Sequence, residues 1–223
     1  SAMCLVIISI CSKSFSQDNL AEEWEKGYLQ RQPPEKIMPA IGVKQGMVIG
    51  EVGAGRGRFT VYLAKEVGPS GKVYANDIDE RALSYLKGRA VRQGFKNIEV
   101  IPGKPDDSRF MDNSLDMAIM VLVYHMIEKP DELLRNLKAS LKPGANLVII
   151  DPVDKFIDEE FGIDRSKPGP KPPTIRERIE NSAKAAGYEL IKTETFLPGD
   201  YSFILKPALL KSRLRILWQK NPG

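Results

Sequence analysis

The stretch Val48-Ile49-Gly50-Glu51-Val52-Gly53-Ala54-Gly55-Arg56-Gly57-Arg58-Phe59 decides the fold of this chain. Its apolar beginning suits a strand that is covered on both faces, and the apolar spacing after it predicts a helix. Between the two, three glycines at alternate positions let the backbone turn sharply and come close to a ligand. The start of the helix adds unpaired N–H groups and the positive end of a dipole. We therefore expect a ligand over this glycine turn.

Short apolar runs alternate with helical patterns over most of the chain. We expect strands at residues 47–52, 72–77, 98–101, 114–121 and 147–150, and helices at 17–32, 35–41, 59–66, 79–93, 130–141 and 174–186. Such alternation predicts parallel strands joined by crossover helices, with both faces of the sheet covered. After Asp151 the alternation stops. Residues 167–173 predict a surface loop, and the runs 188–195 and 201–205 predict an antiparallel hairpin.

Composition narrows the class of protein. The chain has 223 residues, 42% hydrophobic and 28% charged, with a net charge of +4, which is ordinary for a globular protein with one large core. The excess positive charge lies in the tail, so the body shows no nucleic-acid footprint. Cys4 and Cys11 have no zinc spacing and no neighbouring ligands, and we expect no metal site.

Both ends of the chain leave alternatives open. Residues 3–11 are as long as the core of a signal peptide, and Ser14-Phe15-Ser16 offers small residues for cleavage before Gln17. Either residues 1–16 are a signal and the protein is exported, or they dock on a cytoplasmic domain, which is our expectation. The basic tail either lies on an anionic membrane or docks on its own or a neighbouring subunit. The oligomeric state is open.

Four groups of residues should meet where the parallel strands end, because an open α/β sheet binds its ligand beyond the carboxyl ends of its strands. The first is the glycine turn. The second is Asp77, about 20 residues after Gly57, a common place for a carboxylate that binds ribose hydroxyls. The third is the loop 103–107, and the fourth is the pair Tyr124-His125.

The glycine turn is compatible with NAD and with S-adenosylmethionine, and two residues separate them. Dinucleotide sites use G-x-G-x-x-G, whereas this chain has Arg58 at the last position and Gly57 one residue earlier. Glu51 would repel a pyrophosphate, but it suits the sulfonium and ammonium groups of S-adenosylmethionine. Both observations favour S-adenosylmethionine.

From about Gln32 to Lys206 the chain resembles the class I S-adenosylmethionine-dependent methyltransferases. Four pieces carry the resemblance in order: the first motif at 51–57, the second-strand acid within 73–79, the segment 113–116 before strand four, and the segment 141–145 before strand five. The resemblance implies a doubly wound α/β fold with a seven-stranded, mostly parallel sheet and an antiparallel last strand. We divide the chain into an N-terminal segment (1–32), a methyltransferase domain (33–206) and a basic tail (207–223).

The resemblance also implies roles for individual residues. The methionine moiety would bind at the first motif, and the ribose at the end of the second strand. The adenine would bind at the loop 104–107, although Pro105 has no N–H to offer it. The implied cofactor-binding residues are Glu51, Gly53, Ala54, Gly55, Gly57, Asp77, Ile78, Lys104, Pro105 and Asp106.

On the acceptor side, His125 is the only histidine and its ordinary pKa suits a base near neutral pH. The alternative is a histidine that packs against or caps the next helix. Tyr124 is either a catalytic or pocket-wall residue or a core residue, and Asp200 and Tyr201 either line the pocket or serve the turn. We expect lids from the Trp24 helix and the proline-rich loop.

The sequence leaves three functions open. We expect a methyltransferase acting on a small-molecule acceptor, because neither a DNA-type Asn/Asp-Pro-Pro-aromatic signature nor an aromatic, basic RNA groove is present. The first alternative is an NAD-dependent oxidoreductase. The second is a nucleoside-binding module that has kept the fold without the chemistry.

Overall fold

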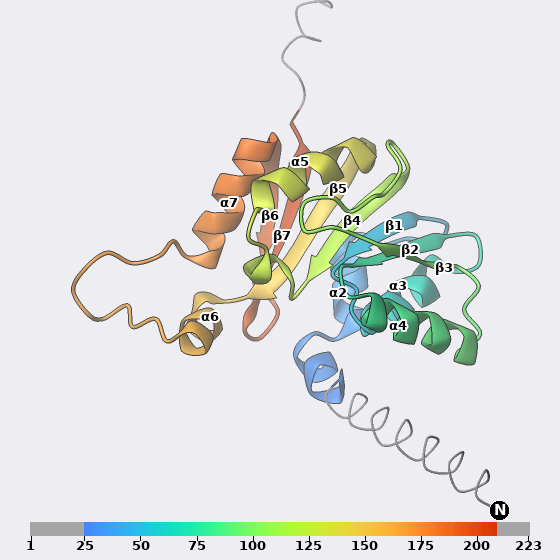
Figure 1. The fold of residues 1–223 in the computed structure, drawn as a ribbon, viewed down its shortest axis with the longest axis horizontal. Coiled ribbons are helices and arrows are strands. Elements are labelled where there is room, and N and C mark those ends of the chain that lie inside the picture. The colour runs from blue at the N-terminus through green and yellow to red at the C-terminus, as the bar shows by residue number, and fades with distance from the viewer. Residues whose placement is uncertain (1–24, 209–223) are drawn as a thin grey trace, which may run out of the picture.

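The computed structural model describes residues 25–208 and contains a seven-stranded sheet in the order β3-β2-β1-β4-β5-β7-β6 (Figure 1). The strands are β1 (Val48–Val52), β2 (Lys72–Asp77), β3 (Ile98–Pro102), β4 (Leu115–Val121), β5 (Leu141–Pro152), β6 (Tyr188–Glu194) and β7 (Asp200–Pro207). Neighbouring strands from β3 to β5 run parallel, and β7 runs antiparallel to both β5 and β6. The predicted doubly wound sheet with an antiparallel last strand is confirmed.

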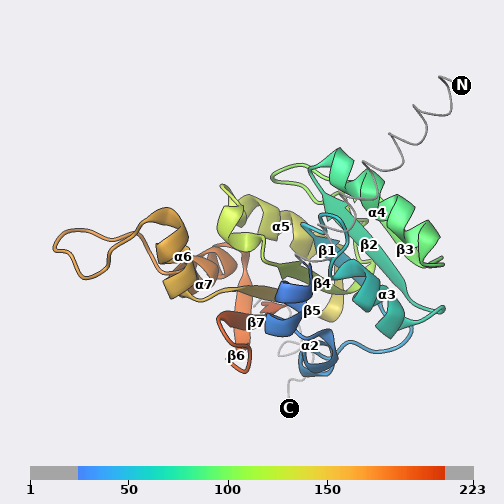
Figure 2. The same cartoon turned by 90° about the horizontal axis from the view of Figure 1, so that it is seen from below.

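Helices cover both faces of this sheet. They are α2 (Pro34–Ile41), α3 (Thr60–Val67), α4 (Glu80–Arg92), α5 (Pro130–Ser140), α6 (Asp154–Phe161) and α7 (Ile175–Ala186), with a single 3-10 turn η1 (Tyr124–Met126). Helices α2, α3 and α4 lie on one face, and α5 and α7 lie on the other (Figures 1 and 2). Helix α6 and the loop after it project from the body beside the carboxyl ends of the central strands.

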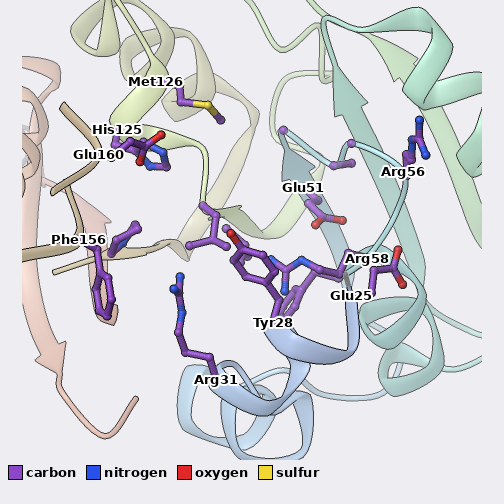
Figure 3. Close-up of a pocket in the computed structure, with 17 residues that line it drawn as sticks. Glu25, Tyr28, Arg31, Glu51, Arg56, Arg58, His125, Met126, Phe156 and Glu160 are labelled. Carbon is purple, nitrogen blue, oxygen red and sulfur yellow. The ribbon is translucent and has the colours of Figure 1, made fainter. Parts of the chain in front are cut away.

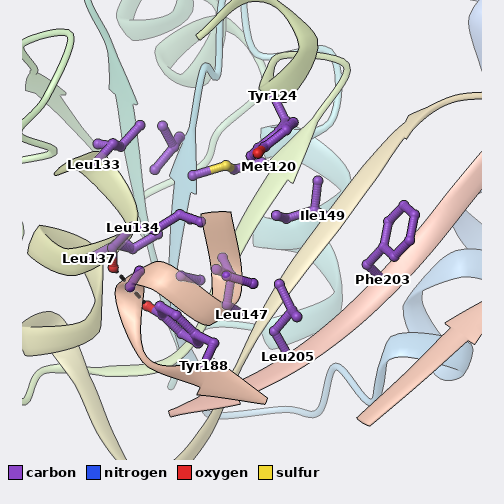
Figure 4. Packing of buried hydrophobic residues seen from close by; sticks show 14 of the residues in the cluster. Met120, Tyr124, Leu133, Leu134, Leu137, Leu147, Ile149, Tyr188, Phe203 and Leu205 are labelled. Atoms are coloured by element: carbon purple, nitrogen blue, oxygen red, sulfur yellow. Dashed lines mark hydrogen bonds between the residues drawn. The ribbon is translucent and has the colours of Figure 1, made fainter. Parts of the chain in front are cut away.

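The central strands are buried on both sides, which explains their nearly continuous apolar sequence. In β4, Ala118 and Met120 pack with α5 and α7, whereas Met117 and Ile119 pack with α2 and α3. Figure 4 shows the first of these cores, in which the Tyr188 hydroxyl donates to the carbonyl of Leu134 at 3.1 Å. Two cores on one sheet hold β1 and β4 rigidly at the point where the strand order reverses.

Most predicted elements have the expected ends. Asp79 accepts hydrogen bonds from the N–H groups of Arg81 and Ala82 at the start of α4. Thr174 and Glu177 form a reciprocal capping box on α7, which ends at a left-handed Gly187.

Two local predictions are wrong. Strand five was expected at 147–150, but residues 142–144 also lie within β5, where the register with β4 shifts. Gly144 still has a positive φ of 84°, so the turn chemistry is used to make a bulge rather than to end the strand. Helix α6, after Asp151, was not predicted, because it has only eight residues and most of them are charged.

Residues 25–31 are helical and end before Pro33, as expected. The Trp24 side chain, the signal-peptide prediction for residues 1–16 and most of the basic tail lie outside the described residues. Between residues 25 and 208 no helix is long and apolar enough to cross a membrane.

Candidate active site

A cavity of about 890 Å³ opens at the carboxyl ends of β1, β4 and β5 (Figure 3). The glycine turn and the residues after it form one end of the cavity, and His125 with α6 forms the other. The helix 25–31, which we call the lid helix, lies along one side between the two ends. The lining residues are Glu25, Tyr28, Arg31, Glu51, Gly53, Ala54, Gly55, Arg56, Arg58, Phe59, Val121, Leu122, His125, Met126, Pro152, Phe156 and Glu160.

The three turn glycines all have positive φ, at 74°, 53° and 83°. At Gly53 a Cβ would overlap the side chain of Val123, and at Gly57 it would overlap that of Leu86. At Gly55 a Cβ would meet nothing within 4 Å. Two of the glycines therefore allow the protein to pack against its own turn, and Gly55 is the one that leaves space toward a ligand.

Glu51 is buried at the end of β1 and faces the cavity. Its carboxylate accepts a hydrogen bond of 2.6 Å from the Thr60 hydroxyl at the start of α3. Burial raises the pKa of Glu51 to about 7, although the Thr60 hydrogen bond and the charge of Arg58 lower it and Asp77 adds a smaller upward push. A cationic ligand group would stabilise the ionised form of this carboxylate.

The lid helix bridges the two halves of the domain through one ion pair at each end. At its first described residue, Glu25 forms a bidentate pair with Arg89 of α4, at 2.7 and 2.9 Å. At its end, Arg31 forms a bidentate pair with Asp200 at the start of β7, at 2.9 and 3.0 Å. Both pairs are largely buried, and their fork geometry fixes the position of the lid helix over the cavity.

The Tyr28 ring lies between two guanidinium groups under the lid. The Arg31 Cζ is 5.1 Å from the ring centroid and the Arg58 Cζ is 5.3 Å from it. Such cation–π contacts place both arginines at the cavity wall. The Phe156 ring of α6 contacts the same Arg31, at 5.4 Å, so the lid helix also contacts the acceptor end of the cavity.

His125 forms a dyad with Asp151, the residue that follows Ile150 in β5. The ring Nδ1 lies 2.6 Å from Asp151 Oδ1, and the backbone N–H of His125 donates to Oδ2 at 2.8 Å. Burial lowers the pKa of His125, but the hydrogen bond and the charge of Asp151, helped by Glu160, outweigh burial and raise it. With Nδ1 held by the carboxylate, Nε2 is the nitrogen available to exchange a proton in the cavity.

Tyr124 does not reach the cavity. Its side chain is fully buried in the core of α5 and α7 (Figure 4). Its hydroxyl pairs with Ser182 at 2.6 Å and donates to the Arg178 carbonyl at 2.9 Å. Of the two alternatives for Tyr124, the geometry fits a core residue. Tyr201 does not line the cavity either, because it packs against Phe203 and Arg176.

The predicted ribose and adenine residues lie beside the cavity rather than among its lining residues. Asp77 accepts hydrogen bonds from the N–H groups of Gly55, at 2.7 Å, and Asp79, at 2.9 Å, so it supports the glycine turn from behind. The N–H of Gly103 donates to the Asp77 carbonyl at 2.9 Å, which fixes the loop 103–107 next to this carboxylate. In that loop, Lys104 and Asp107 pair through their backbones, and Ile78 is 64% exposed nearby.

Sequence reasoning missed the residues that come from distant elements. Asp151, Phe156, Glu160, Tyr28 and Arg31 all contribute to the cavity or its dyad. Asp151 carried a usable signal, because a carboxylate that directly follows a strand beside β4 must lie close to the residues after β4. The others carried none, and no residue of the predicted proline-rich lid lines the cavity. In residues 25–208, no three or more histidine, cysteine or acidic side chains form a group that could hold a metal.

Comparisons with known proteins agree with this geometry. The ubiquinone/menaquinone biosynthesis C-methyltransferase UbiE of Hahella chejuensis is 26% identical over 126 residues, 55% of this chain and 51% of that protein. The demethylmenaquinone methyltransferase of Lactococcus lactis is 33% identical over 118 residues, 52% of this chain and 46% of that protein. The chain thus spans about half the length of the curated relatives it matches.

A solved structure extends the likeness to most of the chain. The structure of a SAM-dependent methyltransferase from Aquifex aeolicus superposes with a TM-score of 0.66 at 28% identity, covering 78% of this chain and 89% of that one. The profile of the family described as "Methyltransferase domain" matches residues 43–193, which begin two residues after the end of α2 and run into β6. This chain therefore belongs to the methyltransferase-domain family.

Proposed function

We propose that the protein is an S-adenosylmethionine-dependent methyltransferase that acts on a small-molecule acceptor with an ionisable hydroxyl group. The observation that carries this proposal is that one cavity joins the glycine turn with Glu51 at one end to the His125–Asp151 dyad at the other. A cofactor end and a base end that share one cavity suit a group transfer between two small molecules.

The residues at the glycine-turn end fit S-adenosylmethionine. Glu51 offers a buried negative charge to the ammonium and sulfonium groups, Gly55 leaves space for close approach, and Asp77 lies behind the turn for the ribose hydroxyls. When bound, this cofactor supplies a methyl group that its sulfonium has already activated. What remains for the protein is to align the acceptor and to manage the acceptor's proton.

At the other end of the cavity, His125 would take the proton from the acceptor hydroxyl through Nε2. Asp151 holds the ring in one orientation and stabilises the imidazolium that forms. The ionised hydroxyl can be methylated itself, or it can make a neighbouring ring carbon nucleophilic. The Phe156 ring at this end suits a planar acceptor, and the relatives are named for methylation in ubiquinone and menaquinone biosynthesis.

The test has two stages. Calorimetric titration with S-adenosylhomocysteine and, separately, with NAD should show binding of the first alone. Turnover is then measured as S-adenosylhomocysteine release with a panel of substituted phenols and hydroquinones, against alcohols and amines as controls. We expect turnover within the phenolic group, and His125→Ala should lower kcat by about 100-fold or more, with a flattened pH–rate profile.

Two results would contradict the proposal. Tight NAD binding without S-adenosylhomocysteine binding would support the oxidoreductase alternative. Turnover in which the pH–rate profile of His125→Ala matches that of the unmodified protein would remove the histidine as the base.

A further inference from the structure

Arg58 is a buried cation that the protein itself leaves incompletely bound. Only 8% of the residue is exposed, and its Nη1 has no hydrogen-bond partner within residues 25–208. Burial lowers the pKa of Arg58, against the charges of Glu51, Glu25, Tyr28 and Asp200, which raise it. A buried donor with no acceptor costs free energy, so such a group in a cavity wall calls for a ligand that supplies the acceptor.

The neighbouring arginines show how this protein satisfies a buried guanidinium when the role is structural. Arg31 and Arg89 each meet a carboxylate in a two-bond fork, from Asp200 and Glu25 respectively. The Nη1 of Arg58 meets no such partner among residues 25–208, and the guanidinium is placed instead by the face of the Tyr28 ring. Its position at the cavity wall therefore leaves one side of its guanidinium to a bound molecule.

The second charge at this end of the cavity has the opposite sign. Glu51 and Arg58 line the same wall and interact electrostatically. A single ligand group that satisfies both would carry a cation and an anion a few bonds apart, which describes the zwitterionic end of an α-amino acid. A pyrophosphate or a simple carboxylic acid would satisfy Arg58 but would be repelled by Glu51.

We propose that Arg58 binds the carboxylate of the cofactor's amino-acid end while Glu51 binds its ammonium group. The assignment rests on the proposed function, since it requires that the cavity holds S-adenosylmethionine or its product. Arg58 is thus a recognition residue for the cofactor, and the lid helix takes part through Tyr28, which fixes the guanidinium plane. A lysine at this position would keep the charge but lose the planar fork.

Three ligands can be used to test the two charges of the amino-acid end one at a time. S-adenosylhomocysteine carries both the ammonium and the carboxylate. The analogue 5′-deoxy-5′-(3-aminopropylthio)adenosine keeps the ammonium and lacks the carboxylate, and 5′-methylthioadenosine lacks both. Each is titrated calorimetrically into the unmodified protein and into Arg58→Met, Arg58→Lys and Glu51→Gln. Arg92→Met, which removes an exposed cation from α4, controls for the change in net charge.

We expect Arg58→Met to weaken the binding of S-adenosylhomocysteine by about 30-fold, which is the scale of one charged hydrogen-bonded contact. The Kd values of the other two ligands should change by no more than about threefold. The affinity of Arg58→Lys for S-adenosylhomocysteine should lie between that of the unmodified protein and that of Arg58→Met. Glu51→Gln should weaken the two ligands that carry the ammonium and spare 5′-methylthioadenosine. Arg92→Met should change none of them.

Two outcomes would overturn the proposal. If Arg58→Met weakens all three ligands equally while its thermal unfolding stays cooperative, the arginine only supports the cavity. If it weakens none, the carboxylate binds elsewhere. Failure of the proposed function looks different, because the unmodified protein would then bind none of the three ligands.

Discussion

The two ends of the cavity are built in opposite ways. At the glycine-turn end, most lining residues come from one short stretch of sequence, residues 51–59. At the acceptor end, the residues come from the turn after β4, from β5 and from α6, and the lid helix reaches across from the N-terminal side. Backbone conformation makes the first end, whereas long-range hydrogen bonds and ion pairs such as His125–Asp151 and Arg31–Asp200 make the second.

This difference predicts how each end responds to substitution. A turn that depends on positive φ and close packing should fail by losing its fold. At an end that is assembled from paired side chains, a substitution should leave the protein folded but disturb the alignment of the catalytic and binding groups. The following predictions test that contrast.

The largest effect is expected at Gly57. Alanine there combines a φ of +83° with an overlap against Leu86, and it should lower the free energy of unfolding by about 3 kcal/mol or more. Gly88→Ala is the matched control, because this helical glycine of α4 meets only the flexible end of Arg92, and alanine should stabilise by about 0.5–1 kcal/mol. Urea unfolding of both variants measures the difference. Equal stabilities would refute the view that the turn is fixed by packing.

At the acceptor end, Asp151→Asn should lower kcat by about 100-fold while leaving the Kd for S-adenosylhomocysteine unchanged. The carboxylate raises the pKa of His125, so its loss should lower that pKa. A base works in its neutral form, and the rising acid limb of the pH–rate profile should therefore move to lower pH. An unmoved acid limb would show that Asp151 holds structure only.

The two ion pairs of the lid helix should differ in what they control. Arg31→Ala breaks the pair with Asp200 beside the acceptor end and should raise the acceptor KM about tenfold, with reduced hydrogen-exchange protection in residues 25–31. Arg89→Ala breaks the pair with Glu25 beside the glycine turn and should mainly weaken S-adenosylhomocysteine. Lys155→Ala, which removes an exposed pair with Glu159, should change neither. Identical effects of the first two variants would show that the lid acts as one rigid piece.

The smallest effect is a pH dependence of cofactor binding. In the free protein the pKa of Glu51 is about 7, and an ammonium group beside it should lower this pKa. Binding therefore releases a proton, and affinity should rise about tenfold between pH 6 and pH 8. The free energy of unfolding of the free protein should instead fall as the pH rises. A carboxyl group whose pKa is raised by folding stabilises the folded protein at low pH, and this stabilisation is lost as the pH rises through 7. Glu51→Gln should remove both trends, which calorimetry and thermal unfolding can follow.

The same contrast explains how far sequence reasoning reached. Apolar runs, Asp79 and Gly187 mark elements through local propensity, and the fold they predict is confirmed. The glycine turn was readable because its chemistry lies in consecutive residues. Helix α6 was not readable because it is short and mostly charged. The Arg31–Asp200 pair was not readable because only the folded chain brings residues 169 positions apart into contact.

Strand β7 has a consequence for how acceptor preference can change. A strand that runs against its neighbours begins where they end, so Asp200 and the turn before it lie at the rim of the cavity although they come late in the chain. Gly199 packs directly against Phe156 of α6. Leu197 in this turn is buried in the core with Ile49 of β1, but Thr195, Phe196 and Pro198 are exposed. Variation at these three exposed positions can therefore reshape the acceptor end without disturbing β1 or the glycine turn. For directed evolution, this hairpin turn is a place where new substrate selectivity can be sought at little risk to cofactor binding.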